Sequence, residues 1–288
     1  MYRLVVLTVL IILLASCEKD LVSQQKTTAP ENANLTVSIY SIEHTPFESL
    51  TRVAASQACN HLNFMVYDME GARVKQTNQM LGDADFGKAS FQLAEGSYQL
   101  VAVAHSSNGN PTATDITKIR FSNSQGFTDT FIQYLPVTVT SQSQSLQLSL
   151  QRIVSLCRFI LTDDYPQNVK QMRFYYTGGS GGFNATTGYG SINSTQILSF
   201  DVAAGQKQFD LYTFLHADEG TIHLTATAYD ASDNVLHERE FDIPLRRNEV
   251  TRVSGPFFSG SGLTNFNIIN VSSVDINTTW GGQTTINY

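Results

Sequence analysis

Histidine, cysteine and acidic side chains carry much of protein chemistry, and this chain of 288 residues has six histidines and three cysteines. We expect no nucleophile elbow among them, and the H-E-x-x-H and C-x-x-C patterns are absent. His216 and His223 lie seven positions apart in different predicted strands, which makes them poor partners for one metal ion. The sequence therefore predicts a protein that is not an enzyme and holds no metal and no cofactor.

Two short runs could hold ions but lack the residues that such sites need. Gly178–Gly182 could cradle a phosphate, but the Lys-Ser/Thr pair that completes a P-loop does not follow it. We interpret this run as a turn or loop between strands. Asp83 and Asp85 have the spacing of a calcium loop, but the third acid is missing and position twelve is Ala94.

Cys17 directly follows an apolar run. Residues 4–15 are apolar except for Thr8, and Arg3 precedes them. About 20 apolar residues are needed to cross a bilayer as a helix, so this run is too short for a span and is typical of a secretory signal peptide. The stretch 14–17, Leu-Ala-Ser-Cys, resembles the bacterial lipobox, in which the cysteine is acylated and becomes the first residue. We predict a lipoprotein signal peptide at 1–16 and lipidation of Cys17; an ordinary signal with an incidental cysteine is the alternative.

Residues 17–33 are rich in Gln, Thr, Lys and Asn with one Pro, which predicts a flexible tether. Glu18, Lys19 and Asp20 partly resemble the export tag of Bacteroidetes surface lipoproteins. Two or three acyl chains would anchor the mature chain durably. We therefore expect it on the outer membrane, held by its lipid and exposed at the cell surface.

Composition favours a folded protein that does not bind nucleic acid. Hydrophobic residues make up 42% of the chain and charged residues 15%, and the formal net charge is −7. Loss of Arg3 with the signal makes it −8, the wrong sign for neutralising phosphates. Cys59 and Cys157 are about 100 residues apart in apolar runs, which favours two separate buried thiols over a disulfide.

Apolar residues recur with the period of two that is typical of β-strands. Residues 91–93 and 98–103 flank Gly96 and read as a hairpin, and residues 222–229 and 235–243 flank a turn at 230–234. The other predicted strands cover 35–42, 62–67, 131–140, 146–150, 172–176 and 208–212. No long amphipathic helix is evident, so we predict an all-β protein of two tandem antiparallel β-sandwich domains, 34–151 and 152–288.

Several stretches together resemble a known family. They are the lipobox and tether, then residues 62–68, 96–98, 148–154, 175–180, 245–251 and 255–258. This ensemble resembles the fimbrillin-like lipoproteins of Bacteroidetes, especially the FimB-type minor subunits that anchor the fibre. The resemblance implies two transthyretin-like, Greek-key sandwiches and assembly with fimbrial shaft subunits by β-strand addition, in which one subunit's strand fills another's groove.

In shaft subunits of that family, an arginine-specific protease removes the N-terminal strand. The resemblance makes Arg52 a candidate for this cut, and an uncut surface arginine is the alternative. If Arg52 stays intact, the groove remains filled by the chain's own strand and the subunit can only donate a strand.

Residues 264–280 continue past a Gly/Ser spacer with three apolar residues on one face of a predicted strand: Val274, Ile276 and Trp280. They could be a donor strand, or the last strand of the second sandwich. The expected function is a lipid-anchored fimbrial subunit. The alternative is a surface glycan-binding lipoprotein of a polysaccharide-uptake system, which the single tryptophan disfavours.

Overall fold

The protein is described by a computed structural model that covers residues 30–43, 59–202 and 206–259, and the backbone of 52–53, 267–269 and 283–284. Every regular element in these ranges is a β-strand, and they contain no helix long and apolar enough to cross a bilayer. The strands are β1 (Leu35–Glu43), β2 (Arg52–Val53), β3 (His61–Tyr67), β4 (Arg73–Met80), β5 (Lys88–Phe91), β6 (Gly96–His105), β7 (Ile119–Arg120), β8 (Thr130–Val139), β9 (Gln144–Arg152), β10 (Val154–Leu161), β11 (Gln171–Thr177), β12 (Gly182–Phe183), β13 (Gln196–Asp201), β14 (Gln208–Phe214), β15 (Glu219–Tyr229), β16 (Val235–Arg246), β17 (Val250–Gly255), β18 (Asn267–Ile269) and β19 (Gln283–Thr284).

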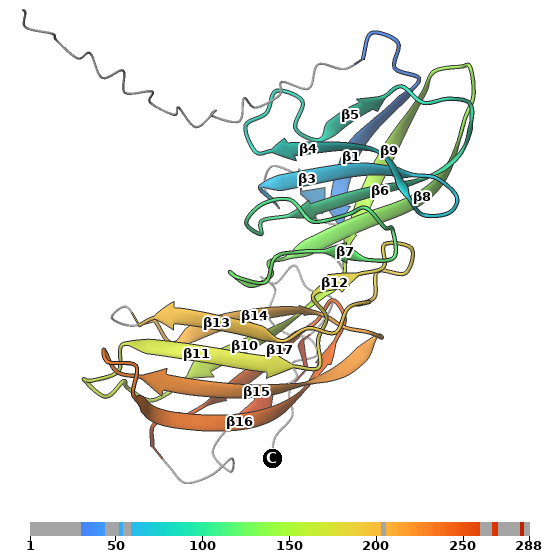
Figure 1. Cartoon of the computed structure of the whole chain (residues 1–288). Coiled ribbons are helices and arrows are strands. Elements are labelled where there is room, and N and C mark those ends of the chain that lie inside the picture. Colours follow the sequence, from blue (N-terminus) through green and yellow to red (C-terminus); the bar gives the residue numbers. More distant parts are fainter. Residues whose placement is uncertain are drawn as a thin grey trace, which may run out of the picture.

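The N-terminal strands form one continuous sheet that folds over a core. Its order is β2-β1-β9-β8-β6-β3-β4, with β5 on the free side of β1. The β8–β9 pairing is confined to Phe131↔Arg152 and Ile132↔Gln151. The sheet opens at this corner into two layers, β4-β3-β6-β8 and β5-β1-β9 (Figure 1). Apolar side chains from both layers, such as Val37 and Phe64, form the N-terminal core between them.

The layer of β3 and β6 is buried on both faces. In β3, Phe64 and Val66 face the N-terminal core, whereas Met65 and Tyr67 face a second cluster of buried residues. A strand covered on both sides is a continuous apolar run, which is why residues 64–67 are all apolar or aromatic. The second cluster also contains Phe214 from the C-terminal half, so it forms part of the junction between the halves.

Two facing sheets make up the C-terminal half. One has the order β14-β10-β17-β18 with β19 also on β17, and the other has the order β13-β11-β15-β16. Their inner faces enclose a separate core that includes Phe159, Phe174 and Phe241. The all-β sandwich fold expected from the sequence is therefore confirmed.

The hairpin predicted around Gly96 is wrong. β5 pairs with β1, whereas β6 pairs with β3 and β8. Residues 92–95 carry the chain from one layer to the other, so a turn-like sequence between two strands here marks a change of layer. The hairpin predicted around the 230–234 turn is confirmed, because β15 and β16 pair antiparallel and Asp233 adopts the positive φ that the turn needs.

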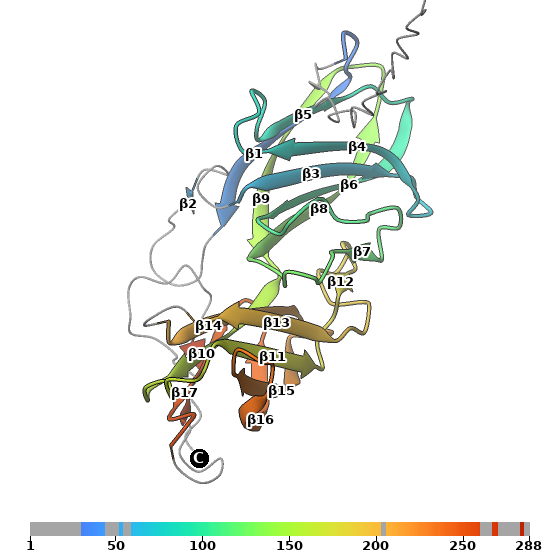
Figure 2. The same ribbon diagram turned by 60° about the vertical axis from the view of Figure 1, so that its left-hand side comes forward.

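Arg152 lies where the chain passes from one half to the other. Its guanidinium is buried and donates to both carboxylate oxygens of Asp129, over 2.6 and 2.7 Å, and lies 4.8 Å from the ring centre of Phe131. Beside it, β7 of the N-terminal half pairs with β12 of the C-terminal half (Figure 2). Arg152 also donates to the side-chain oxygen of Asn248 in the C-terminal half over 3.3 Å. The halves are thus joined by this hydrogen bond, a two-stranded ribbon and the shared apolar cluster.

Replacing Asp129 by Asn should destabilise the protein by about 3 kcal/mol, because it leaves the buried Arg152 charge uncompensated. Urea titration at neutral pH measures this loss. Asp164→Asn is the matched control, since Asp164 pairs with Lys207 at 2.7 Å but is 97% exposed, and its loss should cost less than about 1 kcal/mol. Equal losses in the two variants would contradict the role given to Arg152.

Candidate strand-exchange site

The strand β1 lies between two partners along most of its length. It pairs antiparallel with β5 from Leu35↔Phe91 to Ser38↔Lys88, and parallel with β9 from Leu35↔Gln144 to Glu43↔Gln151. The side chains of Leu35, Val37 and Ile42 are 0% exposed. Without β1, these two neighbours would present unpaired backbone groups above an apolar floor, and we call this space the β1 slot.

A bulge divides the slot into two registers. The pairing with β9 shifts between Ile39 and Ser41, and Tyr40 between them is 57% exposed. Beyond the bulge Ser41 is buried, with its hydroxyl 3.0 Å from that of Ser149, and Ile42 faces the core. The extra residue resets the alternation, so apolar positions fall at 35, 37 and 39 and then at 42.

Asn34 fixes the start of β1. Its amide nitrogen donates to the carbonyl of Leu93 over 2.9 Å, and its amide oxygen accepts from the N–H of Leu93 over 3.0 Å. One side chain therefore imitates a backbone pairing just outside the strand. Sequence reasoning missed this residue, because an asparagine before a strand looks like any other loop residue.

Arg52 lies beside the far end of β1. β2 pairs antiparallel with β1 through Glu43↔Arg52 and Ile42↔Val53. A cut after Arg52 would separate β1 covalently from the rest of the chain. Cleavage after Arg52 stays a prediction. Lipidation of Cys17 also stays a prediction, because Cys17 and residues 18–29 of the predicted tether lie outside the described residues.

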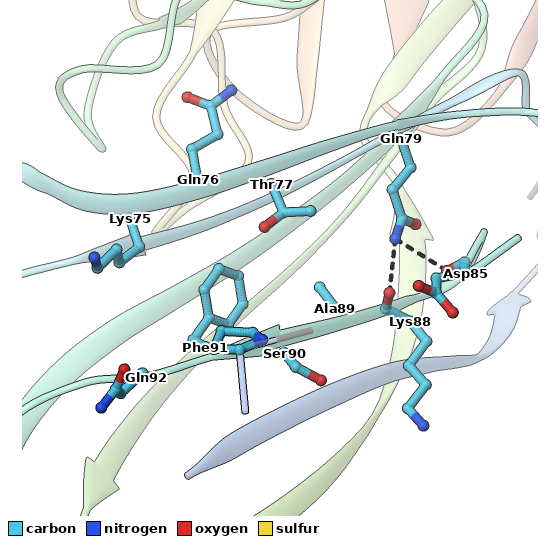
Figure 3. A pocket seen from close by; sticks show the side chains of 11 residues that line it. Lys75, Gln76, Thr77, Gln79, Asp85, Lys88, Ala89, Ser90, Phe91 and Gln92 are labelled. Carbon is cyan, nitrogen blue, oxygen red and sulfur yellow. Dashed lines mark hydrogen bonds between the residues drawn. The ribbon is translucent and has the colours of Figure 1, made fainter. Parts of the chain in front are cut away.

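A second opening of the N-terminal sheet lies between β4 and β5, and we call it the seam (Figure 3). It encloses about 320 Å³, and polar residues of β4 face it. Lys75, Thr77 and Gln79 lie opposite Val66, Phe64 and Leu62 of β3 and therefore occupy the core-facing positions of β4. Inward polar side chains on an edge strand oppose strand addition. This protection makes the seam a poor acceptor compared with the β1 slot.

The side chain of Gln79 also holds the connection between β4 and β5 in place. Its amide nitrogen donates to the carbonyls of Asp85 and Lys88, over 3.0 and 2.6 Å, and its oxygen accepts from the N–H of Gly87 over 2.9 Å (Figure 3). The side chain is fully engaged and is not available to a ligand. The predicted calcium-like spacing of Asp83 and Asp85 thus falls in a tight connection between two strands.

The predicted donor strand 264–280 is described only at 267–269. There β18 pairs antiparallel with β17, from Arg252↔Ile269 to Ser254↔Asn267, and β19 pairs parallel with β17 at Val250↔Gln283 and Thr251↔Thr284. Residues 264–266 and 270–280 lie outside the described residues. The described parts thus lie on the chain's own C-terminal sheet.

The start of this C-terminal segment is held by Asp163. Its carboxylate accepts backbone N–H groups of Phe257, Phe258 and Ser259 over 2.7–2.9 Å. Burial raises the pKa of Asp163, but these N–H donors outweigh it and leave the pKa below its usual value. Arg239 holds the same segment by donating to the carbonyl of Phe257 over 2.8 Å.

The glycine run 178–182 is structural. A Cβ on Gly178 would lie 2.2 Å from the carbonyl oxygen of Thr221, and one on Gly182 would lie 2.3 Å from that of Ile119. The run also has the G-x-S-x-G spacing of a nucleophile elbow, so the expectation that the chain lacks this motif is wrong at the level of sequence. Ser180 is completely buried, and its hydroxyl donates to the carbonyl of Ile192 over 2.7 Å. The chain after Ser180 continues into the strand β12 instead of a helix. Ser180 is not placed as a nucleophile.

The remaining candidate residues do not converge. His216 contacts the carbonyl of Gly190 over 2.9 Å, whereas His223 contacts Asp242. Within the described ranges, no group of three or more histidine, cysteine, aspartate or glutamate side chains could hold a metal ion. Cys59 and Cys157 are both buried and form no disulfide, as predicted, and burial raises the pKa of Cys59 to about 12.

Sequence reasoning also missed a stacked histidine pair, of which His105 is buried and His61 half-buried. The rings of His61 and His105 stack with centroids 5.0 Å apart. The ring of His105 also packs edge-to-face with Phe121, which belongs to the second cluster of buried residues, at the junction between the halves. His105 contacts Asn63 through Nε2 over 2.9 Å, but Nδ1 of both histidines is buried without a hydrogen-bond partner. Burial, and then the neighbouring His61, lowers the pKa of His105 to about 3. Nearly parallel rings cannot aim nitrogens at one ion.

Comparison with known proteins identifies a family and a fold. The model of DUF6562, a family of unknown function, matches residues 25–285. No curated protein matches the sequence. The structure resembles a candidate adhesin from Bacteroides ovatus, with 11% identity, a TM-score of 0.52 and coverage of 86% of this chain and 94% of that one. It also resembles candidate polysaccharide-binding proteins (DUF1812) from Bacteroides thetaiotaomicron, with 12% identity, a TM-score of 0.51 and coverage of 82% and 95%. At these identities the likeness shows the fold alone.

The histidine pair should make the fold sensitive to acid. Both imidazoles have a pKa below the unfolded value, so stability is full above pH 6.5 and falls as the unfolded chain gains protons. For His105 the loss between pH 7 and pH 5 is about 2 kcal/mol. Urea titrations across this range should show that His105→Gln loses less free energy of unfolding between pH 7 and pH 5 than the wild type does. The control His216→Gln, at an exposed position, should lose as much as the wild type. Parallel pH profiles for wild type and His105→Gln would contradict this account.

Truncation after Gly262 should lower the melting temperature, because it removes β18 and β19 from the edge of β17. Thermal unfolding followed by circular dichroism measures the effect. Truncation after Thr284 keeps both strands and is the control. If the segment were only a donor strand, the shorter variant would melt like the control.

Proposed function

The chain belongs to the DUF6562 family, and we propose that it is a lipid-anchored subunit of a surface fimbrium that assembles by β-strand addition. The observation that carries the proposal is the β1 slot. One N-terminal strand pairs on both edges, contributes three fully buried apolar side chains and has Arg52 paired with its last residue, Glu43. Such a strand can be replaced by a partner's strand without changing the surrounding sheet.

The state of β1 decides the role in the fibre. With β1 in place the slot is filled, so the subunit only donates a strand and ends the fibre at the membrane, as FimB-type anchors are expected to do. After a cut at Arg52 the lipid and the body separate, and the subunit acts within the shaft or at the tip. We favour the anchor, with the two sandwiches acting as separate domains, 34–151 and 152–288.

The comparisons support a surface role of this kind. The candidate adhesin from Bacteroides ovatus has the same fold over most of both chains. The sequence features at 1–20 fit export to the outer membrane and a lipid on Cys17. A fibre subunit of this type needs no catalytic residue and no cofactor.

Glycan binding is a second candidate function. The seam favours it, because amide and hydroxyl groups of Thr77, Ser90 and Gln92 line a cavity of about 320 Å³, and one fold relative is a candidate polysaccharide-binding protein. Against it, the aromatic residue of the seam, Phe91, is only 4% exposed and offers no ring face for a sugar. Glycan-array binding that is lost in Gln92→Ala would favour this function over the fibre.

The protein recovered from outer membranes tests the proposal through its N-terminus and mass. An anchor should begin at acylated Cys17, and a processed subunit should begin at Val53. Recovery of an unacylated chain that begins elsewhere and binds no fimbrial protein would contradict the proposal.

Cys17→Ala should abolish acylation and either release the protein from the membrane fraction or leave an uncut precursor. Incorporation of labelled fatty acid measures this, with Cys59→Ala as the control that should label like the wild type. Equal labelling of Cys17→Ala and wild type would refute the lipid anchor.

A further inference from the structure

We infer that the outer face of the β13-β11-β15-β16 sheet, together with a groove beside β13, binds a neutral polysaccharide. This site goes beyond the role in a fibre and does not rest on strand addition. It also lies apart from the seam, which belongs to the N-terminal sheet. An exposed tyrosine ring, a wall of amide and hydroxyl groups and a row of carboxylates make up the site.

Tyr175 supplies the ring on the outer face of β11. Its neighbours Phe174 and Tyr176 point into the C-terminal core, so the alternation of the strand turns Tyr175 outward, where it is 43% exposed. Among the described residues, no ring or cation stacks on Tyr175 and no group bonds its hydroxyl. An exposed aromatic ring binds the C–H groups on the face of a sugar, and the seam has no such ring.

The side chains beside Tyr175 extend this platform. Ile197 on β13 and Thr225 on β15 lie directly opposite Tyr175 in two antiparallel pairings, which places their side chains about 5 Å from it. Two residues along β11, Arg173 donates to the hydroxyl of Tyr229 over 3.0 Å and lies 4.3 Å from the centre of that ring. These contacts hold the guanidinium against the sheet, where its remaining N–H groups can donate to sugar hydroxyls.

A groove of about 740 Å³ adjoins the platform along β13, the edge strand of the sheet that lies nearest to the N-terminal half (Figure 1). Ile197 lines this groove and so connects it to Tyr175. No residue that lines the groove is charged, and its polar lining consists of Asn123, Ser124, Gln125, Thr195 and Ser199. Uncharged amides and hydroxyls are suited to a ligand that is rich in hydroxyl groups.

The wall of the groove is fixed to the sheet. The amide nitrogen of Asn123 donates to the carbonyl of Thr195 over 3.0 Å. Gly126 has a φ of +75°, and a Cβ at this position would lie 2.5 Å from a methyl group of Leu198, so the loop packs closely on β13. A fixed wall lowers the entropy cost of binding. The same loop would obstruct a peptide strand along this edge of β13.

Carboxylates on the other side of the face oppose an acidic ligand. Glu238, Glu240 and Asp242 are exposed on β16. Glu240 lies opposite Thr225, in the same row as Tyr175 and about 10 Å from it. A polyanion lying on Tyr175 would be repelled, whereas a neutral sugar chain would find hydrogen-bond acceptors there. The ligand is therefore a neutral polysaccharide.

The apolar part of this face is too small for a protein partner. It consists of Tyr175 and the 52% exposed Ile197, with Val235 at the opposite corner of the sheet. A stable protein interface buries about 800 Å² on each partner around an apolar centre. One ring beside hydrogen-bonding groups matches a sugar chain better than a second copy of this chain.

Binding of the full mature chain to soluble polysaccharides tests the inference by isothermal titration calorimetry. The neutral probes are β-glucan, xylan and mannan, and the acidic probe is polygalacturonate. Tyr175→Ala removes the ring, Tyr175→Phe keeps it, and Gln125→Ala removes an amide from the wall. Val235→Ala is the matched control, because it removes an exposed apolar side chain from the far corner of the same sheet. Melting temperatures show whether each variant is folded.

We expect the chain to bind a neutral probe and not polygalacturonate. Tyr175→Ala should weaken binding about tenfold, and Gln125→Ala about threefold, which tests the site even if Tyr175→Ala does not fold. Tyr175→Phe and Val235→Ala should bind like the wild type. Preference for polygalacturonate, or wild-type binding by folded Tyr175→Ala, would overturn the inference. Loss of binding in Gln92→Ala alone would place the glycan in the seam. Binding of no probe would overturn the inference and leave the fibre role intact.

Discussion

The N-terminal half depends on the pairing of β1 with β9. The backbone pairing of β9 with β8 is confined to Gln151 and Arg152, and β5 has β1 as its strand partner, so the layer β5-β1-β9 exists because β1 lies in its middle. Burying one large apolar side chain contributes about 1.5–3 kcal/mol, and β1 buries three completely. An empty slot would cost a large part of the stability of a typical domain. Under the proposed function, the incoming strand would therefore have to contact the slot before β1 has left it.

The strands with strong local signals could be predicted from sequence, and the features that join distant segments could not. Residues 222–229 and 235–243 combine alternation with an Asp/Asn turn, so their hairpin is visible locally. The false hairpin at Gly96 has the same local signal, because a turn does not reveal which layer the next strand joins. The bulge at Tyr40 also has no signature, since it is defined by the register of β9, more than 100 residues away.

The candidate site shows the same limit. Arg52 was singled out because the family resemblance pointed to it, and Asn34 was missed because its role depends on Leu93. His61 and His105 meet only when β3 and β6 pair, although both flank visible strands. Buried pairs of this kind arise from the packing of separate elements, whereas hydropathy reports only on neighbours in the chain.

The direct passage from β9 to β10 has a mechanical consequence. A single residue, Ile153, separates them, and each pairs in parallel with another strand, β9 with β1 and β10 with β17. When parallel neighbours are pulled in opposite directions along their length, all of their hydrogen bonds carry the load together, whereas strands pulled apart from one end lose them one by one. Tension applied at the N-terminal end of β1 would pass to β9 as shear, cross Ile153 and spread into β17. The fold thus offers a continuous load-bearing path from the start of β1 into the C-terminal sheets.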